Sequence, residues 1–155
     1  VLRNTVPLEL NEGELRHRNN TSSELLLYGY IPLMLSAQCV RKNLFGCTGK
    51  CETVYLKDRY NSEFPVKCCC TPWECSSLEK AKYCYNIIYN SIPYGLPGER
   101  ERVEKLNLQS LRLAFTVEKP EEAREIFKEF QSVYQKNGKP SGRRYTKGHF
   151  KRGAE

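Results

Sequence analysis

All eight cysteines of the chain lie between positions 39 and 84, and this cluster limits the fold more than any other feature of the sequence. They are Cys39, Cys47, Cys51, Cys68, Cys69, Cys70, Cys75 and Cys84. In a small secreted protein they would predict a disulfide framework, but such frameworks usually spread their bridges through the whole fold. No charged segment followed by an apolar one opens the chain, as a secretory signal would. We therefore expect the cysteines to bind a metal ion or a cluster in a soluble, cytoplasmic protein.

The overall composition predicts a single globular domain. The chain has 155 residues, of which 39% are hydrophobic and 28% are charged, close to the average of soluble proteins. Its apolar stretches are shorter than the roughly 18 residues that a membrane helix needs, so we expect no membrane contact. Because the chain begins at Val1 and its one methionine is Met34, we expect it to be a piece of a longer protein.

Three segments have the residue pattern of single β-strands. Residues 5–10 are β-prone, and residues 24–28 form the near-continuous apolar run that is typical of parallel strands buried on both faces. Gly29 is expected to bend the chain after this run. Residues 111–117 alternate between apolar and polar side chains and predict a third strand.

A β-hairpin is predicted within the cysteine-rich segment. Residues 53–57 and 63–67 are short β-prone runs, and the Asp and Asn of residues 58–62 suit a turn between them. Because proline has no backbone N–H, Pro65 predicts that the second strand lies at a sheet edge. The type of element formed by residues 84–92 stays open.

An amphipathic helix is predicted from Pro120. Proline suits the first helical position, and the two glutamates after it complement the positive end of the helix dipole. Gly138 is the predicted stop. The expected core-facing side chains recur at helical spacing. They are Ala123, Ile126, Phe127, Phe130, Val133 and Tyr134.

The net charge of +7 is concentrated at the C-terminal end. Seven of the 25 basic residues lie in residues 136–154, which contain no acidic residue, so the remaining 18 balance the 18 acidic residues. We expect residues 138–155 to form a basic tail that contacts the phosphates of RNA. The predicted contacts are Arg143, Arg144, Lys147, His149, Lys151 and Arg152.

The spacing of the cysteines allows two kinds of metal site. Two close pairs would give the closed tetrahedral set of a structural zinc ion, namely Cys47 with Cys51 and Cys70 with Cys75. Four cysteines from separate segments would instead hold an iron–sulfur cluster. Because side chains alternate along a strand, Cys69 points away from its two neighbours and is expected to be a small buried residue. The same role is the alternative to metal binding for Cys51, Cys68 and Cys75.

Several segments, in order along nearly the whole chain, resemble the C-terminal part of the collagenase-like peptidase family U-32. They are residues 7–11 (Pro-Leu-Glu-Leu-Asn), 28–39 (Tyr-Gly-Tyr-Ile-Pro-Leu-Met-Leu-Ser-Ala-Gln-Cys), 56–59 (Leu-Lys-Asp-Arg), 84–91 (Cys-Tyr-Asn-Ile-Ile-Tyr-Asn-Ser) and 148–153 (Gly-His-Phe-Lys-Arg-Gly). The resemblance implies an enzyme that uses prephenate and a [4Fe–4S] cluster to hydroxylate a pyrimidine of rRNA or tRNA. A related branch serves oxygen-independent ubiquinone synthesis.

The resemblance also implies the ligands of the cluster. The family's cluster cysteines correspond to Cys39, Cys47, Cys70 and Cys84. This chain differs from the family in the insertion of residues 71–83 between the last two of these. Cys68 and Cys75 are therefore the substitutes for Cys70.

The family fold is a β/α barrel similar to the TIM barrel, so the chain is expected to be α/β and to supply the last barrel strands and a cysteine-rich metal-binding appendage. The N-terminal part of the same protein would complete the barrel. The expected regions are barrel strands at 1–38, the cluster-binding region with its hairpin at 39–92, a strand and helix at 93–137, and the basic tail at 138–155.

Candidate catalytic residues lie where the expected strands end, because barrel enzymes act at the C-terminal ends of their strands. They are Glu9, Asn11 and Gln38, and Ser36 is also at such a strand end. For Glu9 and Asn11, a role in capping or bonding a turn is the alternative.

Two other functions stay open. A collagenase-like peptidase is one, although the chain contains neither a His-Glu-x-x-His nor a Gly-x-Ser-x-Gly motif. A zinc-stabilised, non-enzymatic RNA-binding module is the other.

Overall fold

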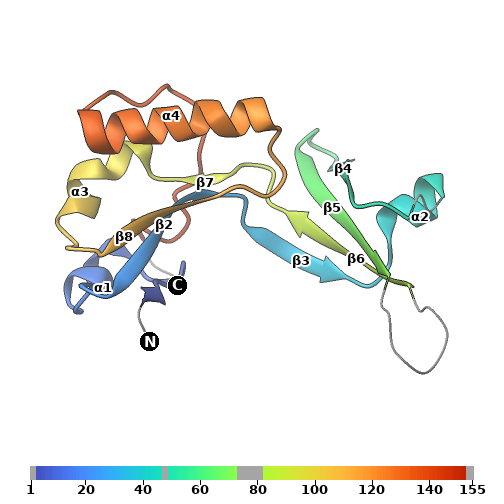
Figure 1. The fold of residues 1–155 in the computed structure, drawn as a ribbon, viewed down its shortest axis with the longest axis horizontal. Coiled ribbons are helices and arrows are strands. Elements are labelled where there is room, and N and C mark those ends of the chain that lie inside the picture. The colour runs from blue at the N-terminus through green and yellow to red at the C-terminus, as the bar shows by residue number, and fades with distance from the viewer. Residues whose placement is uncertain (1–2, 47–48, 73–81, 153–155) are drawn as a thin grey trace. The chain divides into compact units, whose positions relative to one another are not determined.

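The computed structural model describes residues 3–46, 49–72 and 82–152, with residues 70–72, 82 and 83 described by their backbone alone. The chain divides into two compact units, so the prediction of a single domain from length and composition was wrong. The first unit contains Val1–Tyr30 and Ile92–Glu155, and the second contains Ile31–Ser91. Figure 1 shows the elements of both.

The first unit is organised around β2 (Ser23–Gly29), every residue of which is buried. It pairs in parallel with β1 (Asn4–Thr5) and β8 (Ser110–Ala114), and antiparallel with β7 (Tyr94–Gly95). The apolar run at residues 24–28 is therefore a buried strand with parallel neighbours, as predicted. The strand predicted at 111–117 ends sooner, at Ala114.

Short helices accompany this sheet. They are α1 (Glu12–Arg16), the 3-10 helix η1 (Pro97–Glu99) and α3 (Arg100–Glu104). The longer α4 (Pro120–Lys136) lies across the sheet in Figure 1. No helix in the part of the chain that the structure describes is long and apolar enough to cross a membrane.

Helix α4 begins at Pro120 as predicted, but its buried face is narrower than expected. Ile126, Phe130 and Val133 are buried, whereas Phe127 is 51% exposed. Ala123 and Tyr134 are half-buried, and the Tyr134 hydroxyl donates to the Leu96 carbonyl at 2.7 Å, so Phe127 is the predicted core residue that faces solvent. The helix ends at Lys136, because the next residue, Asn137, adopts the left-handed conformation with φ of 57° and caps it one residue before the predicted Gly138.

An aromatic cluster joins β2 to α4. The ring of Tyr28 lies 5.5 Å from that of Phe115, 5.8 Å from that of Phe130 and 6.0 Å from that of Tyr145. The Tyr28 hydroxyl donates a hydrogen bond of 2.7 Å to Glu118, and burial followed by this bond raises the pKa of Tyr28. The cluster thus satisfies its one buried polar group within the unit.

The C-terminal segment packs onto the first unit rather than extending from it as a tail. Thr146 forms a β-bridge with Tyr94, and the ring of Tyr145 packs so closely on β7 that a Cβ at Gly95 would lie 2.5 Å from it. Phe150 is only 2% exposed, and its carbonyl accepts a hydrogen bond of 2.8 Å from the Glu12 amide. Isolated aromatic residues carry no periodic signal, so the sequence left open whether Tyr145 and Phe150 stack on RNA or pack on the protein, and the structure has them packed on this unit.

The second unit is an antiparallel sheet with one helix. Its strands are β3 (Pro32–Ser36), β4 (Glu52–Lys57), β5 (Glu63–Pro72) and β6 (Lys82–Tyr89), in the order β3-β6-β5-β4. The helix α2 (Val40–Phe45) connects β3 to β4 along the chain. The segment whose type the sequence left open is thus largely the central strand β6.

The predicted hairpin is β4 and β5, but the prediction from Pro65 was wrong. Strand β5 lies between β4 and β6 rather than at the edge. Its pairing with β6 begins only at Val66, so Pro65 pairs with Tyr55 of β4 alone. The missing N–H of proline therefore interrupts no bond with β6.

The region predicted to hold barrel strands is divided between the two units. Strand β3 pairs with β6, so residues 32–36 belong to the cysteine-rich unit. The strand predicted at 5–10 is limited to β1, because Pro7 cannot donate to a ladder and residues 8–9 form a turn. Neither sheet closes into a barrel within the described residues, and the larger barrel stays a prediction.

Replacement of Phe150 tests whether the C-terminal segment belongs to the fold. We expect Phe150→Ala to lower the free energy of unfolding by about 3–5 kcal/mol, the usual cost of emptying a buried phenylalanine site. Urea denaturation followed by circular dichroism measures the change. The exposed Arg152→Ala should differ from wild type by about 0.5 kcal/mol or less. Equal stability of the two variants would show that the segment does not contribute.

Candidate metal centre

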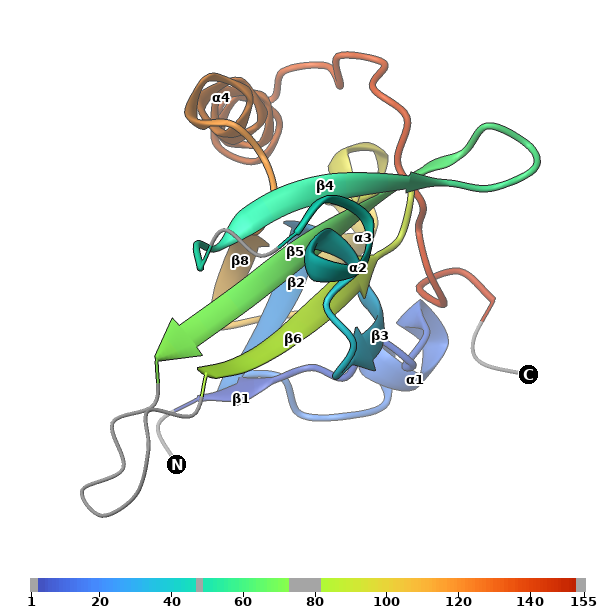
Figure 2. The same ribbon diagram turned by 90° about the vertical axis from the view of Figure 1, so that its right-hand side faces the viewer.

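The register of β5 with β6 places cysteine positions on the sheet near α2. Cys68 lies opposite Asn86, and Cys70 lies opposite Cys84. Because residues two apart on a strand share a face, Cys84 is on the same face as Asn86. Helix α2 packs against this face: Arg41 forms an ion pair of 2.9 Å with Glu52, and the Val40 amide donates to the Asn86 side chain. Figure 2 shows α2 in front of β5 and β6.

Two cysteine thiols meet beneath the start of α2. Cys39 is the N-cap residue, and its sulfur accepts the Lys42 amide at 3.5 Å. Cys68 is 2% exposed. Its thiol lies close enough to the Cys39 thiol and to the Arg41 backbone for both to influence its pKa. The first turn of α2 therefore directs backbone N–H groups at both sulfurs.

The thiol of Cys68 is protonated more readily than an ordinary cysteine. Burial raises its pKa most, the bond from the Arg41 backbone opposes this, and the nearby Cys39 raises the pKa further. Two adjacent thiols cannot both ionise easily without a positive charge between them. A thiophilic metal ion supplies that charge and displaces both protons, so metal binding here should release protons.

The structure tests the predicted ligand set only in part. Cys39 and the half-buried Cys84 are near this face of the sheet, and Cys70 is described by its backbone alone. Cys47 and Cys75 lie outside the described residues. Among the residues that are described, no group of three or more histidine, cysteine or acidic side chains is close enough to hold a metal ion.

Cys68, predicted as a substitute ligand or as a small buried residue, is buried and lies near Cys39. The sequence contained a usable signal: alternation places positions 68 and 70 on one face and 69 on the other. The sequence could not show whether α2 would cover position 68 or position 70 on that face.

The opposite face of the sheet carries a second pair of cysteines. Cys69 is buried, as expected of a small hydrophobic residue, and lies opposite Tyr85. The nearby Cys69 thiol is the main cause of a raised Tyr85 pKa, to which Cys51 also contributes. Cys69 and Cys51 are therefore separated by the sheet from Cys39 and Cys68.

The predicted catalytic residues are not assembled into one site within either unit. Asn11 caps α1, accepting the Glu14 amide at 2.9 Å while Glu14 bonds back to the Asn11 amide, and Glu9 is exposed in a turn. Ser36 and Gln38 belong to the other unit, where the Ser36 hydroxyl bonds the backbone of Gln38. Asn11 thus has the capping role that was the alternative prediction.

Half of the predicted RNA contacts are paired with acidic groups of their own unit. Arg143 forms ion pairs with three glutamates of α4, and Lys147 and Lys151 both pair with Glu99. Arg144 and Arg152 are exposed, and neither forms an ion pair with any described residue. His149 is exposed as well. The positive charge available to a partner is therefore smaller than the sequence suggests.

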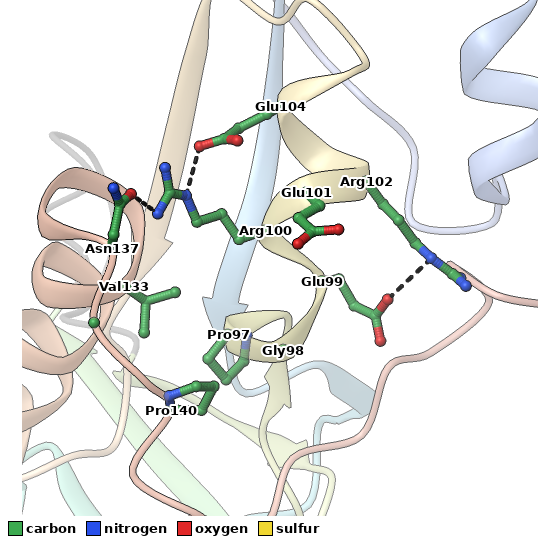
Figure 3. Close-up of a pocket in the computed structure, with 11 residues that line it drawn as sticks. Pro97, Gly98, Glu99, Arg100, Glu101, Arg102, Glu104, Val133, Asn137 and Pro140 are labelled. Carbon is green, nitrogen blue, oxygen red and sulfur yellow. Dashed lines mark hydrogen bonds and ion pairs between the residues drawn. The ribbon is translucent and has the colours of Figure 1, made fainter.

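Glu99 anchors the C-terminal segment at the edge of a cleft of about 650 Å³. Figure 3 shows η1, α3 and the end of α4 around this cleft, with Arg102 reaching Glu99 at 3.5 Å. Burial alone would raise the pKa of Glu99, but hydrogen bonds from Lys147 and Lys151 lower it below its ordinary value. No sequence motif signals this cluster, because Glu99 and the lysines are about fifty residues apart.

Comparison with known proteins adds no relative: no family model, curated protein or solved structure matches the chain. A functional proposal therefore depends on the motifs of the sequence and on the contacts described above.

Replacement of Glu99 should change stability in a pH-dependent way. A carboxyl group with a lowered pKa stabilises the folded state above its ordinary value of 4.5, and this contribution is lost as the pH falls through the folded-state pKa. We expect Glu99→Gln to be less stable than wild type by about 1.5–3 kcal/mol at pH 7. The difference should shrink below pH 4.5 in urea denaturation. The neighbouring exposed Glu101→Gln is the control, and a difference that is constant with pH would contradict the expectation.

Proposed function

We propose that the chain is the C-terminal part of a family U-32 protein whose second unit holds a [4Fe–4S] cluster. The proposal extends to the whole protein: a cytoplasmic enzyme that hydroxylates a pyrimidine of rRNA or tRNA with prephenate as co-substrate. The observation that carries it is that Cys39 and Cys68 lie close together beneath α2, where Asn86, opposite Cys68 on β6, bonds the peptide groups on both sides of Cys39. The ordered motifs of the sequence supply the link to the family.

The residues on this face fit the needs of a cluster. A [4Fe–4S] cluster takes four cysteine thiolates, here from separate segments. Cys39 and Cys68 are in contact, and Cys84 is on the same side of β6 as Asn86. Cys47 follows Gly46, the residue that caps the end of α2. We therefore propose Cys39, Cys47 and Cys84 as ligands, with Cys68 in preference to Cys70 as the fourth.

The surroundings of the two sulfurs support a thiolate role. The backbone N–H groups of Arg41 and Lys42 would donate to ionised sulfur more strongly than to a thiol, and so favour the ligating form. Hydrogen bonds to cluster sulfurs also adjust a reduction potential. When bound, the cluster would supply one-electron redox chemistry or hold the unit to the rest of the protein.

The RNA part of the proposal is supported by charge and by exposed cations. The chain carries a net charge of +7, and Arg144 and Arg152 project from the C-terminal segment without an acidic partner in the described residues. Cations of this kind bind phosphate without reading sequence. They would position RNA, while the choice of base would depend on other groups.

Iron analysis of single-cysteine variants tests the cluster. We expect anaerobically purified chain to contain iron and acid-labile sulfide, and Cys39→Ser and Cys68→Ser each to lose most of both because a ligand is missing. Cys69→Ser, on the other face of the sheet, is the matched control and should retain the wild-type content of iron and sulfide and the visible absorbance of the cluster. A protein that contains zinc and no iron would refute the cluster and favour the zinc-stabilised module.

Nucleoside mass spectrometry tests the reaction. A strain that lacks the gene for the whole protein should lose one hydroxylated pyrimidine from its rRNA or tRNA. The full-length gene should restore it, the gene with Cys39→Ser should not, and the gene with Cys69→Ser should. Unchanged nucleoside composition in the deletion strain would exclude the hydroxylase and leave a binding or peptidase role.

A further inference from the structure

We infer that Asn86 is a positioning residue that holds Cys39 against Cys68 by bonding the peptide groups on both sides of Cys39. The importance of this contact for a cluster rests on the proposed function, whereas the contact itself is a property of the described residues.

The Asn86 side chain uses both ends of its amide. It is 0% exposed and lies opposite Cys68 on β6. Its Oδ1 accepts the Val40 amide at 3.4 Å, and its Nδ2 donates to the Gln38 carbonyl. These two peptide groups flank Cys39, so one side chain fixes the backbone immediately before and after the ligand.

Ser36 supports the same backbone from the neighbouring strand. It lies opposite Asn86 in the pairing of β3 with β6. Its hydroxyl accepts the Gln38 amide at 3.2 Å and lies 3.3 Å from the Gln38 carbonyl, to which it donates. Because Asn86 and Ser36 both hold Gln38, the segment between β3 and α2 has little freedom, and the Cys39 sulfur stays beside that of Cys68.

An amide is the suitable side chain at this position. A buried polar group is costly unless it is bonded, and asparagine provides the required donor and acceptor without charge. An ionised carboxylate would retain the acceptor for Val40 but would repel the Gln38 carbonyl and disfavour ionised sulfur nearby. Leucine would fill a similar volume with neither bond.

The experiment measures the Cys39–Cys68 contact without metal. Diamide oxidises two adjacent thiols to a disulfide and is itself reduced to the hydrazine, taking up the two hydrogens. In the metal-free full chain we expect the Cys39–Cys68 disulfide, identified by peptide mass spectrometry, to form about tenfold more slowly in Asn86→Leu than in wild type. A tenfold change corresponds to about 1.4 kcal/mol, which lies within the range expected for the loss of the two Asn86 hydrogen bonds. The control is Asn43→Leu, an exposed asparagine of α2.

Iron content provides the second measurement. Asn86→Leu should retain less than half of the wild-type iron after anaerobic reconstitution, and Asn43→Leu should retain all of it. Wild-type rates of cross-linking together with wild-type iron content in Asn86→Leu would overturn the inference. If the wild-type chain binds no iron but still forms the Cys39–Cys68 disulfide about tenfold faster than Asn86→Leu, the proposed cluster is refuted. The positioning role of Asn86 then remains supported.

A second variant keeps the test decisive if Asn86→Leu does not fold. Asn86→Ala also removes both hydrogen bonds but introduces no larger side chain. In the folded variant the Cys39–Cys68 disulfide should again form about tenfold more slowly than in wild type, whereas Ser36→Ala, which leaves both Asn86 bonds in place, should slow it less. A wild-type rate in Asn86→Ala would overturn the inference.

Discussion

The antiparallel register of β5 against β6 is the constraint on which the cysteine-rich unit depends. It sets Cys68 beside Asn86, and Asn86 in turn holds the backbone that precedes α2. A slip of one residue would move Cys68 to the opposite face and bring Cys69 to α2. One strand register thus determines which thiols can meet Cys39 and which are confined to the face of Tyr85.

Each of the two units contains a buried polar side chain that is held by specific hydrogen-bond partners. Asn86 in the second unit and Glu99 in the first are both nearly inaccessible to solvent, and both are bonded by groups from distant parts of the sequence. A buried polar side chain with specific partners permits few alternative arrangements. Asn86 orients a candidate ligand, whereas Glu99 attaches the C-terminal segment to η1.

The ion pairs of the C-terminal segment reduce the positive charge that is available to bind a polyanion. The cations of the C-terminal segment looked available for a polyanion when counted along the sequence. In the folded chain Arg143, Lys147 and Lys151 stabilise contacts with α4 and η1, and they would have to exchange those contacts for phosphate. Arg144 and Arg152 are therefore the better candidates for RNA contacts, and the salt dependence of binding should reflect few phosphates rather than many.

The sequence by itself determined the elements whose signal is local. The apolar run of β2, the hairpin turn at Asp58 and the proline that begins α4 each depend on neighbouring residues, and all three were predicted correctly. Tertiary structure alone decided that β3 pairs with β6, that Phe150 is buried and that Cys68 meets Cys39. Each of these depends on contacts between segments far apart in the chain, whose free energy no local pattern of residues encodes.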